Sequence, residues 1–468
     1  MTSRPPAPFV ELPAAAPAPG DATGAAPDAA ETVPAAPARG FFAFADSSLR
    51  GLPGAYWCLF AYLFFVTTCF DEEWPSIGRF RPRLLLGSVA LLVAGLRFLL
   101  AGRPRGAVAP EHRATTNALV AFVAGGLLSM LWAFEPGIAQ DAQIEHTTTM
   151  LVYFLMLAIV RTRRELVVTL LVLAAGMGLY LVRSFTEFVS GKHQFTMGVV
   201  RMMGAGRSIS DPNSFAGTIA FSMPLLVWCA VKTRSAFLRF CVLCYGLLAT
   251  YCVIQTHSRS GLVLHVLNLV FAFVMLPGRG TRIAMAAVVA GMLGWLATGQ
   301  TDEAMERYSS ILSSKTYKSE SSTVGRIEGY RVAWRMFSEN PLTGVGPGCW
   351  STYRMRRVDG DQLMPHNLTG QVIATFGLAG TVPFVAYLGA TFLFAWRVRR
   401  RRKGSKDPWD RAVASFALVV PMTTVLLLIS GLGAHNVDRL AWYLLPGLLA
   451  CAARARDAEA RLATEPAR

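Results

Sequence analysis

The sequence predicts an all-α, polytopic integral membrane protein with about 12 transmembrane helices. Of its 468 residues, 53% are hydrophobic, and the mean hydropathy of +0.41 is too high for a soluble globular chain. Apolar stretches near the length of a bilayer crossing recur along it. A basic block at 397–411, RVRRRRKGSKDPWDR, separates two of these stretches, and such blocks stay on the cytoplasmic side of a membrane.

Twelve candidate spans are separated by polar connections, and their even number places both termini in the cytoplasm. The inner segments hold 26 Lys and Arg and the outer segments hold 17, nine of them in one long loop where charge has little effect on topology. The charge distribution therefore supports this topology. The spans cover residues 52–70, 84–101, 117–134, 147–160, 166–183, 214–231, 240–256, 261–276, 283–299, 370–396, 412–432 and 440–453.

The formal net charge of +16 follows from these short basic connections. We therefore expect contacts with anionic lipid headgroups and no nucleic-acid partner. Eight cysteines are present, most of them inside apolar spans, so no disulfide framework is predicted.

Three regions differ in composition. Residues 1–46 are dense in Ala and Pro and cannot build a packed core, so they are expected to be a disordered cytoplasmic tail. Residues 47–453 form the predicted membrane domain. Residues 454–468 are expected to be a second cytoplasmic tail.

The segment 300–369 is far longer than an ordinary connection, and loops of this length are usually functional. Within it, Ile327, Tyr330, Trp334 and Phe337 recur at helical spacing. They predict an amphipathic helix in a long periplasmic loop, lying against the membrane surface or the helix bundle.

The unusual polar stretches all fall on the outer side. The first, residues 201–213, contains Arg201 and Arg207 and ends in the tripeptide DPN, which is typical of a turn and a helix start. Arginines beside a helix N-terminus form an anion site by charge and by dipole. Contact of the two arginines with lipid headgroups explains this stretch equally well.

The second stretch is the short connection HSRS at 257–260. Because it cannot reach far into water, Arg259 is expected near membrane depth, facing a cavity. A charge at that depth is costly and indicates function, although the side chain could instead extend to the outer headgroups.

The third stretch closes the long loop with the tripeptide PHN at 365–367. A histidine such as His366 can take a proton from a hydroxyl near neutral pH, although an isolated loop histidine is often only a surface residue. Arg326, Arg335 and Asn367 are candidate contacts to a glycan or an acceptor. Since arginine forks match phosphate oxygens, the ligand predicted here is a lipid-linked diphosphate.

No His or Cys pair has the spacing of metal ligands, and no Walker-type phosphate loop is present. The sequence therefore predicts neither a metal site nor a nucleotide cofactor.

With these polar stretches, the chain resembles the superfamily of O-antigen ligases and O-antigen polymerases, which are membrane enzymes of the bacterial envelope. The resemblance covers about residues 200–396, and the order and spacing of four stretches make it specific. The stretches are GRSISDPNSFAGTIAFSMPLL, THSRSGLVLHVLNLV, GRIEGYRVAWRMFSENPLTGVGPGCWSTY and PHNLTGQVIATFGLAGTVPFVAYL.

The resemblance implies a GT-C-like fold in the bacterial inner membrane and transfer of a glycan from undecaprenyl diphosphate at the periplasmic face. It implies an inverting, metal-independent reaction without a cofactor. Arg207, or else Arg201, would bind the diphosphate, Arg259 would be a second phosphate contact, and His366 would activate the acceptor hydroxyl.

The acceptor separates two activities. A ligase of lipopolysaccharide biosynthesis passes the glycan to lipid A-core, whereas an O-antigen or exopolysaccharide polymerase passes it to a second lipid-linked glycan. We expect a ligase first and a polymerase second. An anion or solute transporter is the alternative from another class. A carrier of that kind would show an internal repeat, and none is evident in the sequence.

Overall fold

The structure is a computed structural model in which most of the chain after residue 53 is described. The predicted tail 1–46 and Arg207 lie outside the described residues. All described residues belong to one compact unit, Arg39–Arg468. They are 54–72, 74–101, 112–196, 198–206, 210–276, 278–298 and 317–462.

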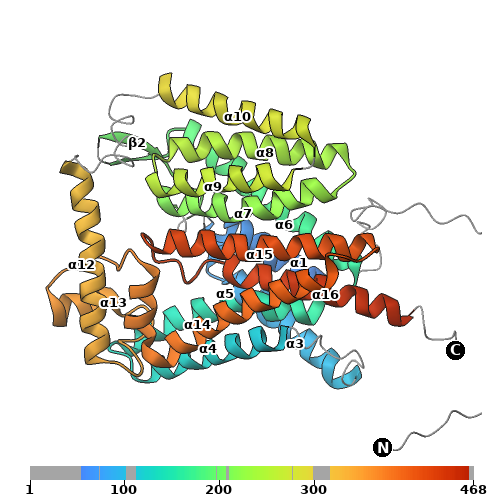
Figure 1. The fold of residues 1–468 in the computed structure, drawn as a ribbon. Coiled ribbons are helices and arrows are strands. Elements are labelled where there is room, and N and C mark those ends of the chain that lie inside the picture. Colours follow the sequence, from blue (N-terminus) through green and yellow to red (C-terminus); the bar gives the residue numbers. More distant parts are fainter. Residues whose placement is uncertain are drawn as a thin grey trace, which may run out of the picture. The chain divides into compact units, whose positions relative to one another are not determined.

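The described chain is almost entirely helical, and every one of the twelve predicted spans coincides with a helix (Figure 1). These helices are α1 (Gly54–Thr68), α3 (Pro82–Ala101), α4 (Arg113–Leu131), α5 (Pro136–Ile159), α6 (Arg163–Val189), α7 (Pro212–Lys232), α8 (Ala236–Gln255), α9 (Arg259–Met275), α10 (Arg279–Thr298), α14 (Leu368–Arg402), α15 (Pro408–Gly431) and α16 (Ala441–Leu462).

Smaller elements connect them. They are a 3₁₀ turn at Phe70–Glu72, α2 (Pro75–Gly78), the antiparallel hairpin β1 (His193–Thr196) and β2 (Val199–Met202), α12 (Tyr317–Glu339), α13 (Trp350–Tyr353) and a π-helical turn at Arg354–Val358. Since α16 continues to Leu462, the first part of the segment expected as a C-terminal tail is helical.

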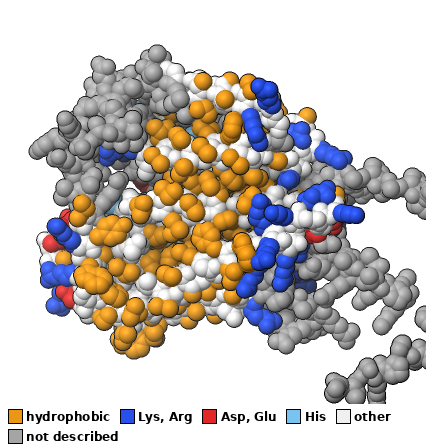
Figure 2. Space-filling view, viewed as in Figure 1, with side chains coloured by type: hydrophobic (Ala, Val, Ile, Leu, Met, Phe, Trp, Pro, Cys, Tyr) orange, Lys and Arg blue, Asp and Glu red, His pale blue; other side chains and the backbone are white. Residues whose placement is uncertain are grey.

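Length and composition support a polytopic membrane protein. Six helices in the described part of the chain are long and apolar enough to cross a bilayer, namely α4, α6, α7, α8, α14 and α15. Three shorter apolar helices are also present there, namely α1, α9 and Ala441–Ala455. In the face shown in Figure 2, hydrophobic side chains cover the middle and Lys and Arg gather toward one end. The count of twelve membrane spans and the GT-C-like arrangement stay predictions.

α14 is broken at Gly377, whose φ of 56° and ψ of −156° are accessible essentially to glycine alone. The turn PLTGVGPG at 341–348 fills the break. Leu378 N donates to Pro341 O at 2.9 Å, and Val345 N donates to Ala374 O at 2.8 Å. The long loop is therefore anchored into the backbone of α14 a few residues beyond His366.

The amphipathic helix of the long loop is present as α12, which runs across one end of the bundle (Figure 1). Its packing against α14 uses the small residues Gly329 and Ala333. Ile327, Tyr330 and Trp334 are exposed, Trp334 by 63%. Of the two surfaces expected for this aromatic face, these three side chains do not lie against the bundle. Contact with the membrane surface stays a prediction.

Candidate functional site

Two of the predicted polar stretches form one hydrogen-bonded junction. Asp211 caps α7, as the DPN tripeptide predicts, by accepting from the backbone N–H groups of Asn213 and Ser214 at 3.0 and 3.1 Å. The Asn213 side-chain oxygen in turn accepts from Arg201 at 3.0 Å and from Ser258 Oγ at 2.8 Å. The start of α7 is therefore joined directly to the start of α9.

Arg201 supports this junction. It lies on β2, is only 6% exposed, and its Nε donates to the carbonyl of Thr256 at 2.8 Å. These bonds join the hairpin to the end of α8. The buried position favours a positioning role, and direct diphosphate binding by Arg201 stays a prediction.

Arg259 is the first residue of α9, where Ser258 Oγ caps the helix by accepting from Gly261 N at 3.1 Å. A Cβ on Gly261 would come within 2.4 Å of the Ala216 side chain, so only glycine lets α9 approach α7 this closely. As the sequence predicts, Arg259 lines a cavity, whose volume is 280 Å³. The other lining residues are Ser260, Val263, Leu264, Ile429, Ser430, Leu432 and Gly433.

His366 is exposed just before α14 and has a φ of +47°, an uncommon left-handed conformation for a residue other than glycine. Asn367 holds this turn. Its side chain is fully buried, caps α14 at Gly370 N and donates to Pro365 O at 2.8 Å. Burial favours a structural role for Asn367, and its contact with the acceptor stays a prediction.

The two other candidate contacts lie on α12. The guanidinium of Arg335 donates to Glu339 at 3.1 Å and to the carbonyls of Arg357 and Val358 at 3.2 Å, so it joins α12 to the π-helical turn. For Arg326 only the backbone is described, and its role stays a prediction.

Gly329 of α12 packs against the 365–367 turn that carries His366. A Cβ added there would lie 2.5 Å from the Pro365 carbonyl oxygen. We predict that Gly329→Ala shifts the 365–367 turn and lowers any activity that depends on His366 by roughly tenfold or more. Gly325→Ala, in the same helix with no atom within 4 Å of the added Cβ, is the control and should leave that activity unchanged. Equal activity of both variants, measured at equal membrane levels, would contradict this role.

A polar loop at 433–439, GAHNVDR, connects α15 to α16 and was not singled out from the sequence. The ring of His435 lies 6.2 Å from that of His366 between centroids. Val437 N donates to Gln371 Oε1 of α14 at 3.3 Å, and Tyr443 OH donates to Val437 O at 2.8 Å. The signal was available: four polar or charged residues in a seven-residue connection on the predicted outer side.

Charged groups meet at this loop. Asp438 forms an ion pair with His146 of α5. Burial alone would raise the pKa of Asp438, but His146, His435 and Arg439 outweigh it and hold the pKa below its usual range. Burial, with the nearby charges of His366 and Arg439, lowers the pKa of His435. His435 is therefore neutral near pH 7.

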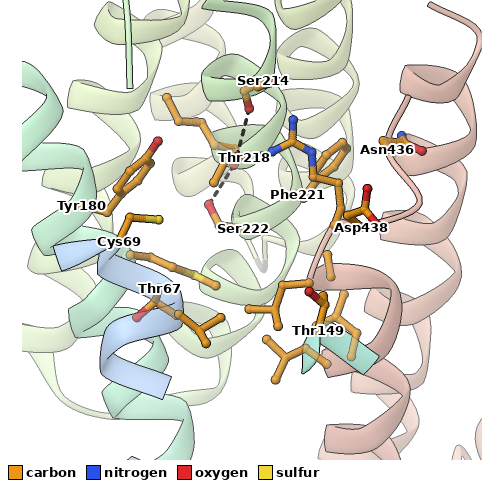
Figure 3. Close-up of a pocket in the computed structure, with 18 of the residues that line it drawn as sticks. Thr67, Cys69, Thr149, Tyr180, Ser214, Thr218, Phe221, Ser222, Asn436 and Asp438 are labelled. Atoms are coloured by element: carbon orange, nitrogen blue, oxygen red, sulfur yellow. Dashed lines mark hydrogen bonds between the residues drawn. The ribbon is translucent and has the colours of Figure 1, made fainter. Parts of the chain in front are cut away.

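The same loop forms one wall of a larger cavity of 310 Å³, which residues of α1, α5, α6, α7, α8 and α16 also line (Figure 3). Carboxylates at Glu145, Asp211 and Asp438 line it, together with Arg83 and Arg439. Apolar residues of the wall include Val66, Met177, Ile219, Phe221, Leu225, Leu440, Leu444 and Leu445. Among the described residues, no group of three or more His, Cys, Asp and Glu is arranged to hold a metal ion.

Fold and site define a multi-pass helical membrane protein whose arginine and histidine motifs converge on one interhelical loop. Residues 244–385 match the family model described as O-antigen ligase. The matched region contains both Arg259 and His366, and it confirms the resemblance to the O-antigen ligase and polymerase superfamily. No curated protein matches the chain.

Proposed function

We propose that the protein is a membrane glycosyltransferase that moves a glycan from an undecaprenyl-diphosphate carrier to lipid A-core, as an O-antigen ligase does. One observation supports this most strongly. The region similar to O-antigen ligases contains Arg259 and His366, and the fold brings both against the segment 429–439, where Gly433 lines the Arg259 cavity and His435 faces His366.

The Arg259 cavity suits the diphosphate of the carrier. Among the described residues that line it there is an arginine and no carboxylate, and Ser260 and Ser430 add hydroxyl groups. Its remaining wall is largely aliphatic, which suits the isoprenoid next to the phosphates. A guanidinium in such a partly apolar setting stabilises the charge that develops on a leaving diphosphate. Arg207, or else Arg201, is proposed to bind the diphosphate together with Arg259.

His366 is proposed to take the proton of the acceptor hydroxyl as that oxygen attacks the anomeric carbon. The new C–O bond forms while the bond from the anomeric carbon to the diphosphate oxygen breaks, and the electron pair leaves with the carrier. Attack from the side opposite the leaving group inverts the configuration. This scheme uses neither a metal ion nor a nucleotide.

The site is proposed to face the periplasm from the inner membrane, with both termini in the cytoplasm. The distribution of Lys and Arg supports this orientation, since the basic block 397–411 stays inside and the stretches at 201–213, 257–260, 365–367 and 433–439 then fall outside.

Deletion of the gene, followed by gel analysis of lipopolysaccharide and lipid-linked glycan, tests this proposal. If the protein is a ligase, we expect the deletion to remove all O-chains from the core while lipid-linked polymer accumulates. Cores capped by a single repeat would instead indicate a polymerase. Unchanged glycan together with altered solute uptake would indicate a carrier and contradict the proposal.

A further inference from the structure

The 310 Å³ cavity is built to hydrogen-bond hydroxyl groups. Ser214, Thr218 and Ser222 follow one another at four-residue intervals, so they lie on one face of α7 and line the cavity (Figure 3). Asn436 and Asp438 line it from the α15–α16 loop, on another side of the same space. Thr218 and Ser222 donate to backbone carbonyls of α7 and keep acceptor lone pairs. The carboxylate of Asp438 adds further acceptor oxygens, so the lining offers mainly acceptors to the hydroxyl groups of a ligand.

The charge balance of this cavity disfavours a diphosphate. Among the described residues that line it, there are three carboxylates and two arginines. One of the arginines, Arg83, already forms salt bridges of 2.7 Å with Asp71 and Glu72. The described part of the lining therefore has no excess of positive charge to bind an anion, in contrast to the Arg259 cavity. A neutral ligand rich in hydroxyl groups fits it better.

The two cavities share the segment 429–441. Residues up to Gly433 line the Arg259 cavity, and residues from His435 onward line the larger one. His435 of this segment has its ring 6.2 Å from that of His366 between centroids. A sugar in the larger cavity would therefore lie next to the histidine pair and on the same loop segment as the proposed diphosphate site, and transfer requires the two substrates to be held close together.

His435 is suited to a hydroxyl ligand. Its ring lines the cavity, and Nδ1 is buried with no hydrogen-bond partner among the residues that the structure describes. Burial and the charges of His366 and Arg439 lower the pKa of His435, and they outweigh Asp438 and Asp211, which act in the opposite direction, so the imidazole is neutral near pH 7. A neutral imidazole offers one donor and one acceptor, the same combination that a sugar hydroxyl provides.

We propose that this cavity binds the hydroxyl-bearing end of the acceptor glycan, and that His435 hydrogen-bonds the acceptor beside His366. The volume of 310 Å³ lies within the range of about 300–1,000 Å³ usual for ligand pockets. The inference rests on the proposed function and adds to it a site for the acceptor, separate from the α12 arginines and from the Arg259 cavity.

The test uses the purified full-length protein in nanodiscs. The donor is lipid-linked glycan extracted from a strain that lacks the gene, and the titrated acceptor is the O-chain-free lipopolysaccharide of that strain. We expect His435→Ala to raise the KM for the acceptor about tenfold, the effect of losing one well-formed hydrogen bond, while the KM for the donor is unchanged. Direct binding of the acceptor lipopolysaccharide should weaken by a similar factor.

A second variant fills the cavity without touching the histidine pair. Ser214→Leu places a bulky side chain on the α7 face and should also raise the acceptor KM selectively. His193→Ala, which removes an exposed histidine of β1 outside the site, is the matched control and should leave both KM values unchanged. Gel filtration and thermal unfolding establish that each variant is folded.

The outcomes separate the two proposals. If the wild-type protein transfers glycan but neither variant moves the acceptor KM, the acceptor site is wrong and the proposed function stands. A rise in the donor KM instead would assign the cavity to the donor and overturn the inference. Absence of transfer by the wild-type protein would overturn the proposed function and this inference together.

Discussion

Replacement of His366 by asparagine is expected to lower glycan transfer by about 100- to 10,000-fold, the contribution typical of a general base. Asparagine is chosen because it tolerates the left-handed backbone that His366 adopts at a φ of +47°. The variant therefore removes the imidazole and keeps the turn that Asn367 holds. Transfer is measured as O-chain attached to lipid A-core in cells that lack the chromosomal gene.

The control for this variant is Thr369→Ala, an exposed position three residues further on, which should transfer normally. Both proteins should reach the membrane in equal amounts. Normal O-chain from the His366→Asn protein would show that another group takes the proton, and the present assignment of the base would be wrong.

Replacement of Arg259 should have an effect of similar size. Arg259→Gln is expected to lower transfer by about 100- to 1,000-fold, because a charged donor aimed at the leaving group is lost from a partly apolar cavity. Arg259→Lys should restore only part of this loss, since an ammonium group lacks the planar fork that matches two phosphate oxygens. Purified variants with extracted lipid-linked glycan provide the measurement.

Arg331→Gln is the matched control for Arg259. Arg331 also lies on the predicted outer side, its side chain is 75% exposed, and its ion pair with Glu328 at 3.4 Å is a surface contact of small energetic value. It should transfer at the wild-type rate. Full activity of Arg259→Gln, or full rescue by lysine, would argue against diphosphate recognition in the 280 Å³ cavity.

Much of the helical framework could be predicted from the sequence, because the length of an apolar stretch reports directly on a helix. The break of α14 could not. It depends on Gly377 and on hydrogen bonds from a turn more than thirty residues earlier in the chain, which no local pattern reveals. The choice between the two surfaces expected for the aromatic face of α12 could not be predicted either, because the packing of α12 depends on a close approach at Gly329 while Trp334 stays exposed.

The site was predictable in its parts. The helix start at Asp211 follows from capping chemistry and is present in the structure, whereas the cap by Ser258 was not predicted. Their connection through Asn213, with Arg201 as a third partner, depends on tertiary packing between residues 45 positions apart. The polar composition of the connection 433–439 was a signal in the sequence, but the pairing of His435 with His366 depends on tertiary packing.

The central claim is that transfer takes place on the outer face of the membrane. On a cysteine-free background, Gln362→Cys beside the PHN turn and Gly404→Cys in the basic block 397–411 can be treated in intact spheroplasts with a maleimide that does not cross membranes. We expect that position 362 is labelled in intact spheroplasts and that position 404 is labelled only after lysis. Labelling of position 404 in intact spheroplasts, with position 362 protected until lysis, would contradict it.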